Sequence, residues 1–204
     1  MVYIRFEEVT IKAGGKILLK DFILDIEKND KIIFMGKSGI GKSTIIKTLL
    51  GFHQIEKGKI LFRNKEIKND LINFRKKFSY LPQNTNIYQG KVIELFQEIA
   101  SYKNSKLLYD QKSLDKELKF FELEKDILKK DFTSLSGGEK QKTLLILAFL
   151  LARGIFLLDE PTASLDASMK NKVIKRLEGM NSTIIVISHD KGWNNKFKKI
   201  KVGK

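Results

Sequence analysis

The chain has 204 residues, of which 42% are hydrophobic, so it is long enough to bury a core and has the composition of a globular domain. It has no cysteine and no run of about 18 apolar residues, which excludes disulfides, thiolate metal sites and membrane-spanning helices, and we expect a cytoplasmic protein without a signal peptide. The formal charge is +15, but only five of the 39 basic residues are Arg. We therefore favour a solvated Lys-rich surface as the explanation of this charge. Attraction to an anionic membrane is less favoured, and nucleic-acid binding is the least favoured.

Apolar runs of strand length alternate with helical periodicity along most of the chain. The runs predict strands at residues 2–6, 22–26, 31–35, 59–62, 78–81, 155–159, 183–188 and 198–202. The periodicity predicts helices at residues 42–50, 137–152 and 167–178. The first strands have no helices between them, whereas strands and helices alternate from residue 31 onward. This order predicts an α/β fold with a mostly parallel sheet and an N-terminal antiparallel section.

The pattern changes between residues 84 and 136, where strand signals are few. Amphipathic helices are predicted at residues 91–101 and 107–121, with a weaker signal at 123–130. No internal repeat or Pro-rich linker divides the chain. We therefore expect a single domain, residues 1–204, that carries a helical insertion at about 84–136.

A glycine-rich motif follows the strand predicted at residues 31–35 and precedes a predicted helix. It matches the P-loop pattern and consists of Gly36, Lys37, Ser38, Gly39, Ile40, Gly41, Lys42, Ser43 and Thr44. Glycines allow successive backbone N–H groups to face one concavity, and the helix that follows adds its positive end. We expect Lys42 to reach the β- and γ-phosphates of a nucleotide and Ser43 to ligate Mg²⁺.

The strand predicted at residues 155–159 ends in two carboxylates, Asp159 and Glu160. Acidic residues at this place can simply begin a helix, and alone they would carry little weight. Together with a P-loop they predict a reaction centre, because ligands bind at the carboxyl edge of parallel sheets. Asp159 is then expected to hold Mg²⁺ and Glu160 to act as general base on the attacking water.

A third motif indicates which class of P-loop protein this is. It is the segment Leu135-Ser136-Gly137-Gly138-Glu139-Lys140-Gln141-Lys142. It resembles the signature sequence of ABC ATPases. Pro82-Gln83 is similar to the Q-loop of that family, Ser164-Leu165-Asp166 to its D-loop, and Ser188-His189-Asp190 to its switch-histidine segment. The resemblance extends over nearly the whole chain and implies the ABC ATPase fold, with a RecA-like core.

The resemblance also implies a mechanism. ATP and Mg²⁺ bind at the P-loop, and two ATPase domains close over two ATP molecules as a homodimer or as a pair of related domains. Ser136, Gly137 and Gly138 would face the γ-phosphate bound to the opposite subunit, and Asp166 would line the interface. His189 would sense the γ-phosphate, and Gln83 would contact Mg²⁺ and the attacking water and couple them to an integral membrane permease.

The resemblance narrows the role to the motor of a transporter, peripheral on the cytoplasmic face of the membrane with a separately encoded permease. Residues 80–83 and 87–92 resemble Q-loop segments of exporters. Residues 135–142 together with 189–191 resemble small stand-alone ATPases that pair with separate permeases, and we favour export over import. A soluble ABC-type ATPase of translation or DNA repair is the alternative. One departure concerns adenine, because Ala13, or Lys12, occupies the place of the usual stacking aromatic residue, although Leu18 could pack against the nucleoside.

Overall fold

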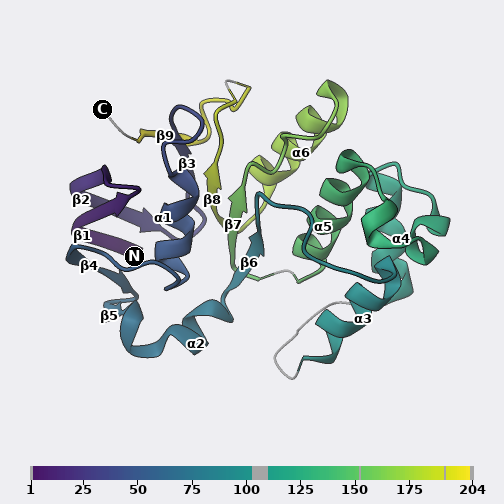
Figure 1. Ribbon diagram of the computed structural model, residues 1–204, viewed down its shortest axis with the longest axis horizontal. Helices are drawn as coiled ribbons and strands as arrows, with labels where there is room; N and C mark the ends of the chain where they lie inside the picture. The colour runs from purple at the N-terminus through teal and green to yellow at the C-terminus, as the bar shows by residue number, and fades with distance from the viewer. Residues whose placement is uncertain (1, 103–109, 152, 191, 203–204) are drawn as a thin grey trace.

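Two β-sheets enclose helix α1 (Lys42–Leu49) in this computed structural model, which describes residues 2–102, 110–151, 153–190 and 192–202. In Figure 1 the smaller sheet lies on the left, α1 lies beside it, and the larger sheet crosses the middle of the molecule. The remaining long helices cover the far face of the larger sheet. Of the positions assigned to helices and motifs from the sequence, residues 107–109, Ala152 and Lys191 lie outside the described residues.

The smaller sheet is antiparallel, with the strand order β2-β1-β4-β5. Its strands are β1 (Val2–Ala13), β2 (Lys16–Glu27), β4 (Lys57–Phe62) and β5 (Lys65–Glu66). Alternate residues of β1, such as Ile4 and Phe6, are fully buried against α1, while Arg5 pairs with Asp25 on the outer face. This alternation is typical of a sheet with one solvated face.

The larger sheet is parallel, with the strand order β6-β7-β8-β3-β9. Its strands are β6 (Phe78–Leu81), β7 (Ile155–Asp159), β8 (Thr183–Ile187), β3 (Lys31–Met35) and β9 (Lys198–Lys201). Within β7, Ile155 and Leu157 join the core around α1, and Phe156 and Leu158 join the core on the opposite face. Both faces are therefore buried, which explains why β7 and β8 are continuously apolar.

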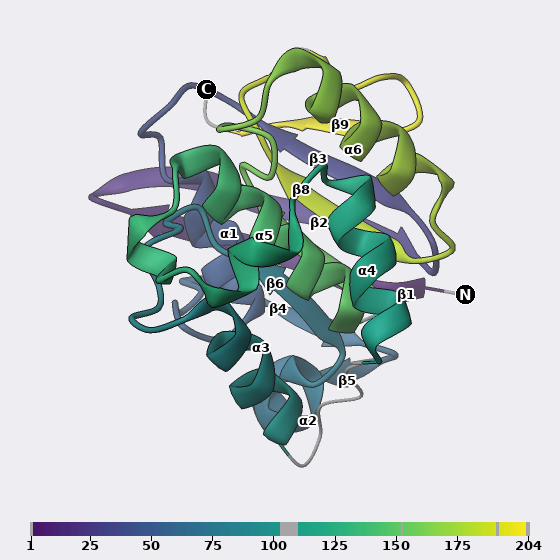
Figure 2. The ribbon, with the colours of Figure 1, turned by 90° about the vertical axis from the view of Figure 1, so that its right-hand side faces the viewer.

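The helices of the second face come from three parts of the chain. Figure 2 shows α3 (Val92–Ser101), α4 (Gln111–Phe120) and α5 (Gly137–Leu151) in front of the sheets, with α6 (Ala167–Gly179) above them. Short elements complete the fold: the 3₁₀ helices η1 (Ile67–Asp70), η2 (Lys125–Lys129) and η3 (Phe132–Ser134), and helix α2 (Leu71–Arg75). No helix among the described residues has the length and apolar character needed to cross a bilayer.

The structure confirms the α/β fold class with its antiparallel and parallel sheets, and it revises several element boundaries. β1 and β2 are each twelve residues long, more than twice the lengths predicted. The helix predicted from residue 107 has its N-cap at Asp110, whose side chain accepts a hydrogen bond from the N–H of Ser113. The weak helical signal at 123–130 corresponds to the 3₁₀ helix η2.

Candidate functional site

The carboxyl ends of four adjacent parallel strands bring together segments that are far apart in the sequence. β3 leads into the P-loop, β8 into Ser188 and His189, and β7 ends at Asp159, directly before Glu160. β6 lies beside β7 and leads to Gln83. Because carboxyl ends of parallel strands share one edge of the sheet, these residues form one candidate site.

The P-loop leaves the start of α1 free for a ligand. Its N-cap is Gly41, which has a φ of 99° and no side chain to cap the helix. The first N–H groups of α1 therefore lack a side-chain partner, and a phosphate can take that place. The Nζ atom of Lys42 is buried over the loop, where it donates hydrogen bonds of 2.9 Å to the carbonyls of Gly36 and Lys37.

Three oxygen-bearing side chains meet behind the P-loop, from α1, β7 and the segment after β6. The hydroxyl of Ser43 donates to Oε1 of Gln83 at 3.3 Å and also lies close to the carboxylate of Asp159. Asp159 is only 2% exposed, and its Oδ1 atom has no hydrogen-bond partner in the part of the chain that the structure describes. A carboxylate, a hydroxyl and an amide oxygen suit Mg²⁺, which protein sites hold with few side chains, water and substrate phosphates. The unpartnered oxygen of Asp159 thus fits such an ion.

Burial dominates the electrostatics of Asp159. It raises the pKa of this carboxyl group above its usual value, and the charge of Glu160 adds to the rise. The nearby Ser43 hydroxyl and the charges of Lys42 and Lys47 oppose it. Burial, with a smaller contribution from Asp159, also raises the pKa of Tyr80 to about 12. Burial therefore makes a negative charge at Asp159 costly, and the charges of Lys42 and Lys47 offset only part of that cost.

Glu160 is held by its neighbours in an unusual conformation. Its φ is 50°, in the left-handed region that side-chain-bearing residues rarely adopt, and its N–H donates to the carbonyl of Ile187 at 2.9 Å. The carboxylate accepts hydrogen bonds from the hydroxyl of Ser188 at 3.1 Å, from the N–H of His189 at 3.2 Å and from Nδ1 of His189 at 2.8 Å. A backbone conformation of this kind costs free energy, and it persists only where the surrounding structure fixes the residue.

The signature segment forms a capping box at the start of α5. The N–H of Ser136 donates to Glu139 at 2.8 Å, and the N–H of Glu139 donates back to the Ser136 hydroxyl at 3.2 Å. The bond from the Ser136 N–H, followed by the Ser136 hydroxyl, lowers the pKa of the Glu139 carboxyl group. A Cβ atom on Gly138 would lie 3.1 Å from the carbonyl of Ser164, so a glycine permits this close approach.

The D-loop packs against the signature segment and then begins α6. In addition to the contact between Gly138 and Ser164, the buried amide of Gln141 donates to the carbonyl of Pro161 at 3.0 Å. Asp166 is the N-cap of α6, where its side chain accepts the N–H of Met169 at 2.9 Å and its pKa is lowered by that bond. From the sequence we expected Asp166 to line the interface between two ATPase domains. Within this chain its side chain accepts a hydrogen bond from its own helix.

The structure places the predicted residues in two groups. The P-loop, Gln83, Asp159, Glu160 and His189 share one sheet edge, whereas Ser136–Gly138 and Asp166 form the second group. Among the described residues, no hydrogen bond joins the signature residues 136–138 to the P-loop residues 36–44. Sequence reasoning assigned no contact to Ser188, although its position between a buried strand and His189 was a usable signal.

The residues expected near a nucleobase are aliphatic. A Cβ atom on Gly41 would lie 3.1 Å from Leu18 and 3.2 Å from Ala13, so both side chains lie against the P-loop. Lys12, the other position considered, pairs with Glu56 and directs its carbonyl to His53. Ala13 and Leu18 can therefore provide apolar contact next to the P-loop, but not an aromatic face.

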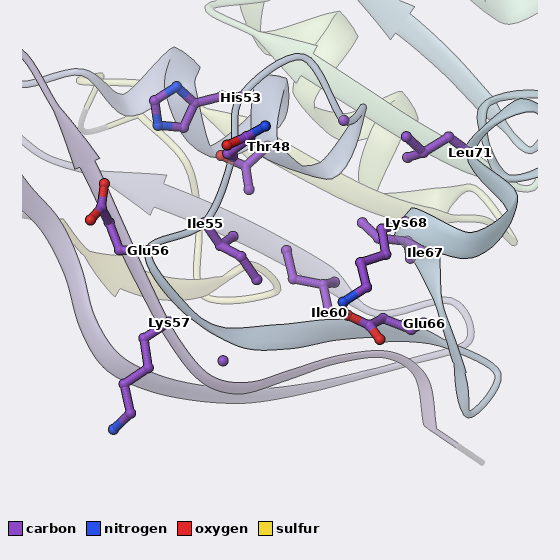
Figure 3. Close-up of a pocket in the computed structure, with 13 residues that line it drawn as sticks. Thr48, His53, Ile55, Glu56, Lys57, Ile60, Glu66, Ile67, Lys68 and Leu71 are labelled. Atoms are coloured by element: carbon purple, nitrogen blue, oxygen red, sulfur yellow. Dashed lines mark ion pairs between the residues drawn. The ribbon is translucent and has the colours of Figure 1, made fainter.

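A separate cavity of about 490 Å³ lies at the opposite end of α1 (Figure 3). Ile55, Ile60 and Ile67 line it together with side chains of both charges, such as Glu66 and Lys68. It contains none of the residues predicted to bind nucleotide. The mixed charge and its place at the negative end of α1 make it unsuited to phosphate.

The chain is similar in sequence to proteins of one family. A family model described as "ABC transporter" matches residues 19–163. A lactococcin transport/processing ATP-binding protein, LcnC-like, from Lactococcus lactis is 32% identical over 91% of this chain, and an Fe(3+) ions import ATP-binding protein, FbpC, from Fusobacterium nucleatum is 30% identical over 93%. The chain spans 27% and 52% of the lengths of these two proteins.

Solved structures share the fold. A dimeric bacterial ABC transporter cassette superimposes with a TM-score of 0.79 at 24% identity, covering 97% of this chain and 94% of the cassette. CbiO1 from Clostridium perfringens, part of the ABC transporter complex CbiONQ, gives a TM-score of 0.75 at 23% identity and covers 100% and 88% of the two chains.

Proposed function

This chain belongs to the ABC transporter family, whose ATP-binding domains hydrolyse ATP, and we propose that it is the ATP-driven motor of a membrane-spanning permease. The observation that carries the proposal is the grouping of Lys42, Asp159, Glu160 and His189 at one edge of the parallel sheet. These side chains supply a phosphate-binding cation, a ligand for a metal, a general base and a group that can report on the γ-phosphate.

The P-loop binds the phosphates of ATP in this proposal. Lys42 exchanges its bonds to the carbonyls of Gly36 and Lys37 for phosphate oxygens, which its flexible side chain permits. Ser43, Gln83 and Asp159 hold Mg²⁺, which when bound neutralises charge on the phosphates. The remaining P-loop residues, 37–41 and Thr44, provide backbone N–H groups around the phosphates.

Glu160 orients and deprotonates the attacking water, and His189 contacts the γ-phosphate. Their side chains are hydrogen bonded to each other, so a His189 that turns toward the γ-phosphate exchanges its bond to Glu160 for one to the nucleotide. The exchange links nucleotide binding to the position of the segment that follows β8. Such a segment can bias a two-state element.

A second copy or a related ATPase domain completes each site. The start of α5 offers N–H groups around Ser136, Gly137 and Gly138, and no hydrogen bond connects these residues to the P-loop of the described chain. We assign them to the nucleotide of the partner, with Asp166 at the shared interface. The fold match to a dimeric cassette is compatible with this arrangement.

The transport direction that we propose is export. Relatives named for lactococcin transport support it, at 32% identity, whereas a relative named for Fe(3+) import is 30% identical. The permease lies in the membrane with this domain at its surface, and the helical insertion at about 84–136 and Gln83 transmit movement to it. No nucleic acid takes part in this scheme.

The experiment is steady-state ATPase activity with Mg²⁺ as a function of protein concentration. We expect turnover per chain to rise with concentration and to be lost in Lys42→Ala. Lys47→Ala is the matched control, because Lys47 lies on the same helix and is exposed. If Lys42→Ala is as active as Lys47→Ala, ATP is not hydrolysed at the P-loop. If turnover per chain does not change with protein concentration and the chain stays monomeric with ATP, the sites are not completed by a partner.

A further inference from the structure

The Glu160 carboxylate has a neighbour that is neither a P-loop residue nor the switch histidine. Ser188 follows β8, is fully buried, and donates its hydroxyl proton to Oε2 of Glu160 at 3.1 Å. His189 occupies the other oxygen, Oε1, through both its N–H and its Nδ1 atom. The two carboxylate oxygens thus have separate partners, and among the described residues only Ser188 forms a hydrogen bond with Oε2.

The Ser188 hydroxyl has its direction fixed. It accepts the N–H of Asp190 at 3.1 Å, so its lone pair faces that N–H and its single proton is left for Glu160. Asp190 is fixed in turn, because its carboxylate pairs with Lys170 on α6 and accepts the N–H of Gly192 at 2.8 Å. A chain of contacts therefore runs from α6, through Asp190 and Ser188, to Glu160.

We propose that Ser188 is a positioning residue that holds the Glu160 carboxylate in the orientation needed to act on water. The inference deepens the proposed function and rests on its assignment of Glu160 as the general base. When His189 turns to the γ-phosphate, Oε1 loses its Nδ1 partner, and Ser188 retains the other oxygen. The bond from Ser188 then sets the rotation of the carboxylate, while Oε1, left with the N–H of His189, has a place for the water.

Substitution of Ser188 should separate binding from chemistry. In Ser188→Ala the buried Oε2 atom loses its donor, whereas the P-loop and Lys42 are unchanged, so ATP affinity is preserved and kcat falls. A hydrogen bond to a charged group corresponds to a loss of roughly tenfold or more. Ser188→Thr keeps the hydroxyl and should restore most of the rate.

The matched control is Ser79→Ala. Ser79 lies on β6 of the parallel sheet and is as buried as Ser188, but its hydroxyl has no hydrogen-bond partner among the described residues. This variant removes the same kind of atom from an equally buried serine and should leave kcat unchanged. ATP binding and thermal unfolding, measured on every variant, identify any that fails to fold.

The deciding experiment is a double-variant cycle of Ser188→Ala and Glu160→Gln, followed by single-turnover ATP hydrolysis. If Ser188 acts through Glu160, adding Ser188→Ala to Glu160→Gln causes little further loss. If Ser188→Ala lowers the rate by the same factor in the unaltered protein and in the Glu160→Gln variant, the inference is overturned. It is also overturned if Ser188→Ala has a normal rate while Glu160→Gln is inactive. That second result leaves the proposed function intact. A normal rate in Glu160→Gln overturns the proposed function and this inference together.

Discussion

The Nδ1 atom of His189 lies 2.8 Å from Oε1 of Glu160, although the two residues are 29 positions apart in the chain. A carboxylate can only accept, so Nδ1 carries the proton and Nε2 is the nitrogen left for another partner. The His189 side chain is 59% exposed, whereas that of Glu160 is 9% exposed. The proposed base is therefore buried and paired, and the histidine can turn toward a ligand in solvent.

Asp159→Asn should stabilise the nucleotide-free protein at neutral pH. Burial raises the pKa of Asp159 above 3.8, so the folded protein holds this proton more tightly than the unfolded chain does. Ionisation therefore costs stability as the pH rises from 3.8 through the folded pKa, and the cost is complete above the folded pKa. The variant removes that charge and should unfold at a higher temperature.

The measurement is thermal unfolding of both proteins across acidic and neutral pH without nucleotide. The stability gap between Asp159→Asn and the unaltered protein should close as the pH falls below 3.8. With Mg²⁺ and ATP the variant should lose hydrolysis. A variant that is less stable at pH 7 would show that Asp159 has a stabilising partner.

Arg176→Leu should strongly destabilise the fold. Arg176 on α6 forms hydrogen bonds of 2.7 and 2.6 Å with the Glu117 carboxylate on α4, and its guanidinium lies 4.0 Å from the ring centre of Phe149. Glu117 is only 7% exposed, so the variant leaves a buried charge without its partner. We expect a loss of about 3 kcal/mol in the free energy of unfolding, measured by urea denaturation.

Lys172→Ala, four residues earlier on the same helix, is the control for Arg176. Lys172 pairs with Glu122, but their side chains are 47% and 59% exposed. Surface pairs of this kind contribute less than about 1 kcal/mol. Equal losses in the two variants would mean that the Arg176–Glu117 pair has no special part in joining α4 to α6.

Ala13→Tyr should increase the affinity for ATP. Ala13 lies against Gly41 of the P-loop, and an aromatic ring at this place could stack on a nucleobase. Stacking contributes roughly 1–3 kcal/mol, which corresponds to a fall in Kd of about fivefold or more. Calorimetric titration with ATP measures it, and Ala13→Leu controls for added apolar bulk. Equal affinities in the two variants would place the base elsewhere.

The sequence predicted which segments meet at the carboxyl edge of the parallel sheet better than it predicted the surrounding packing. Glycine spacing and a strand that ends in Asp159 are local signals, and the parallel sheet aligns them. The length of β1 was underestimated because its register shifts, with Glu8 at a φ of 48°, interrupt the alternation of apolar residues. η1 and α2 were missed because elements of four and five residues have no periodicity to detect.

Contacts between distant side chains had no local signal at all. The bond from Ser188 to Glu160 and the pairing of Arg176 with Glu117 join residues 28 and 59 positions apart. Arg176 and Glu117 look like ordinary charged helix residues in the sequence, and their burial depends on how α4 and α6 pack. Roles that rest on such contacts become visible only in the folded chain.

The most direct test of the central claim is sedimentation of Glu160→Gln with Mg²⁺ and ATP. The account predicts that this variant binds ATP, hydrolyses it far more slowly than the unaltered protein, and accumulates as a dimer of two 23.5 kDa chains. Adding Lys42→Ala to the variant should return it to the monomer. An ATP-bound Glu160→Gln that stays monomeric at every concentration, or that turns over normally, would contradict an ATPase whose sites are completed by a second copy.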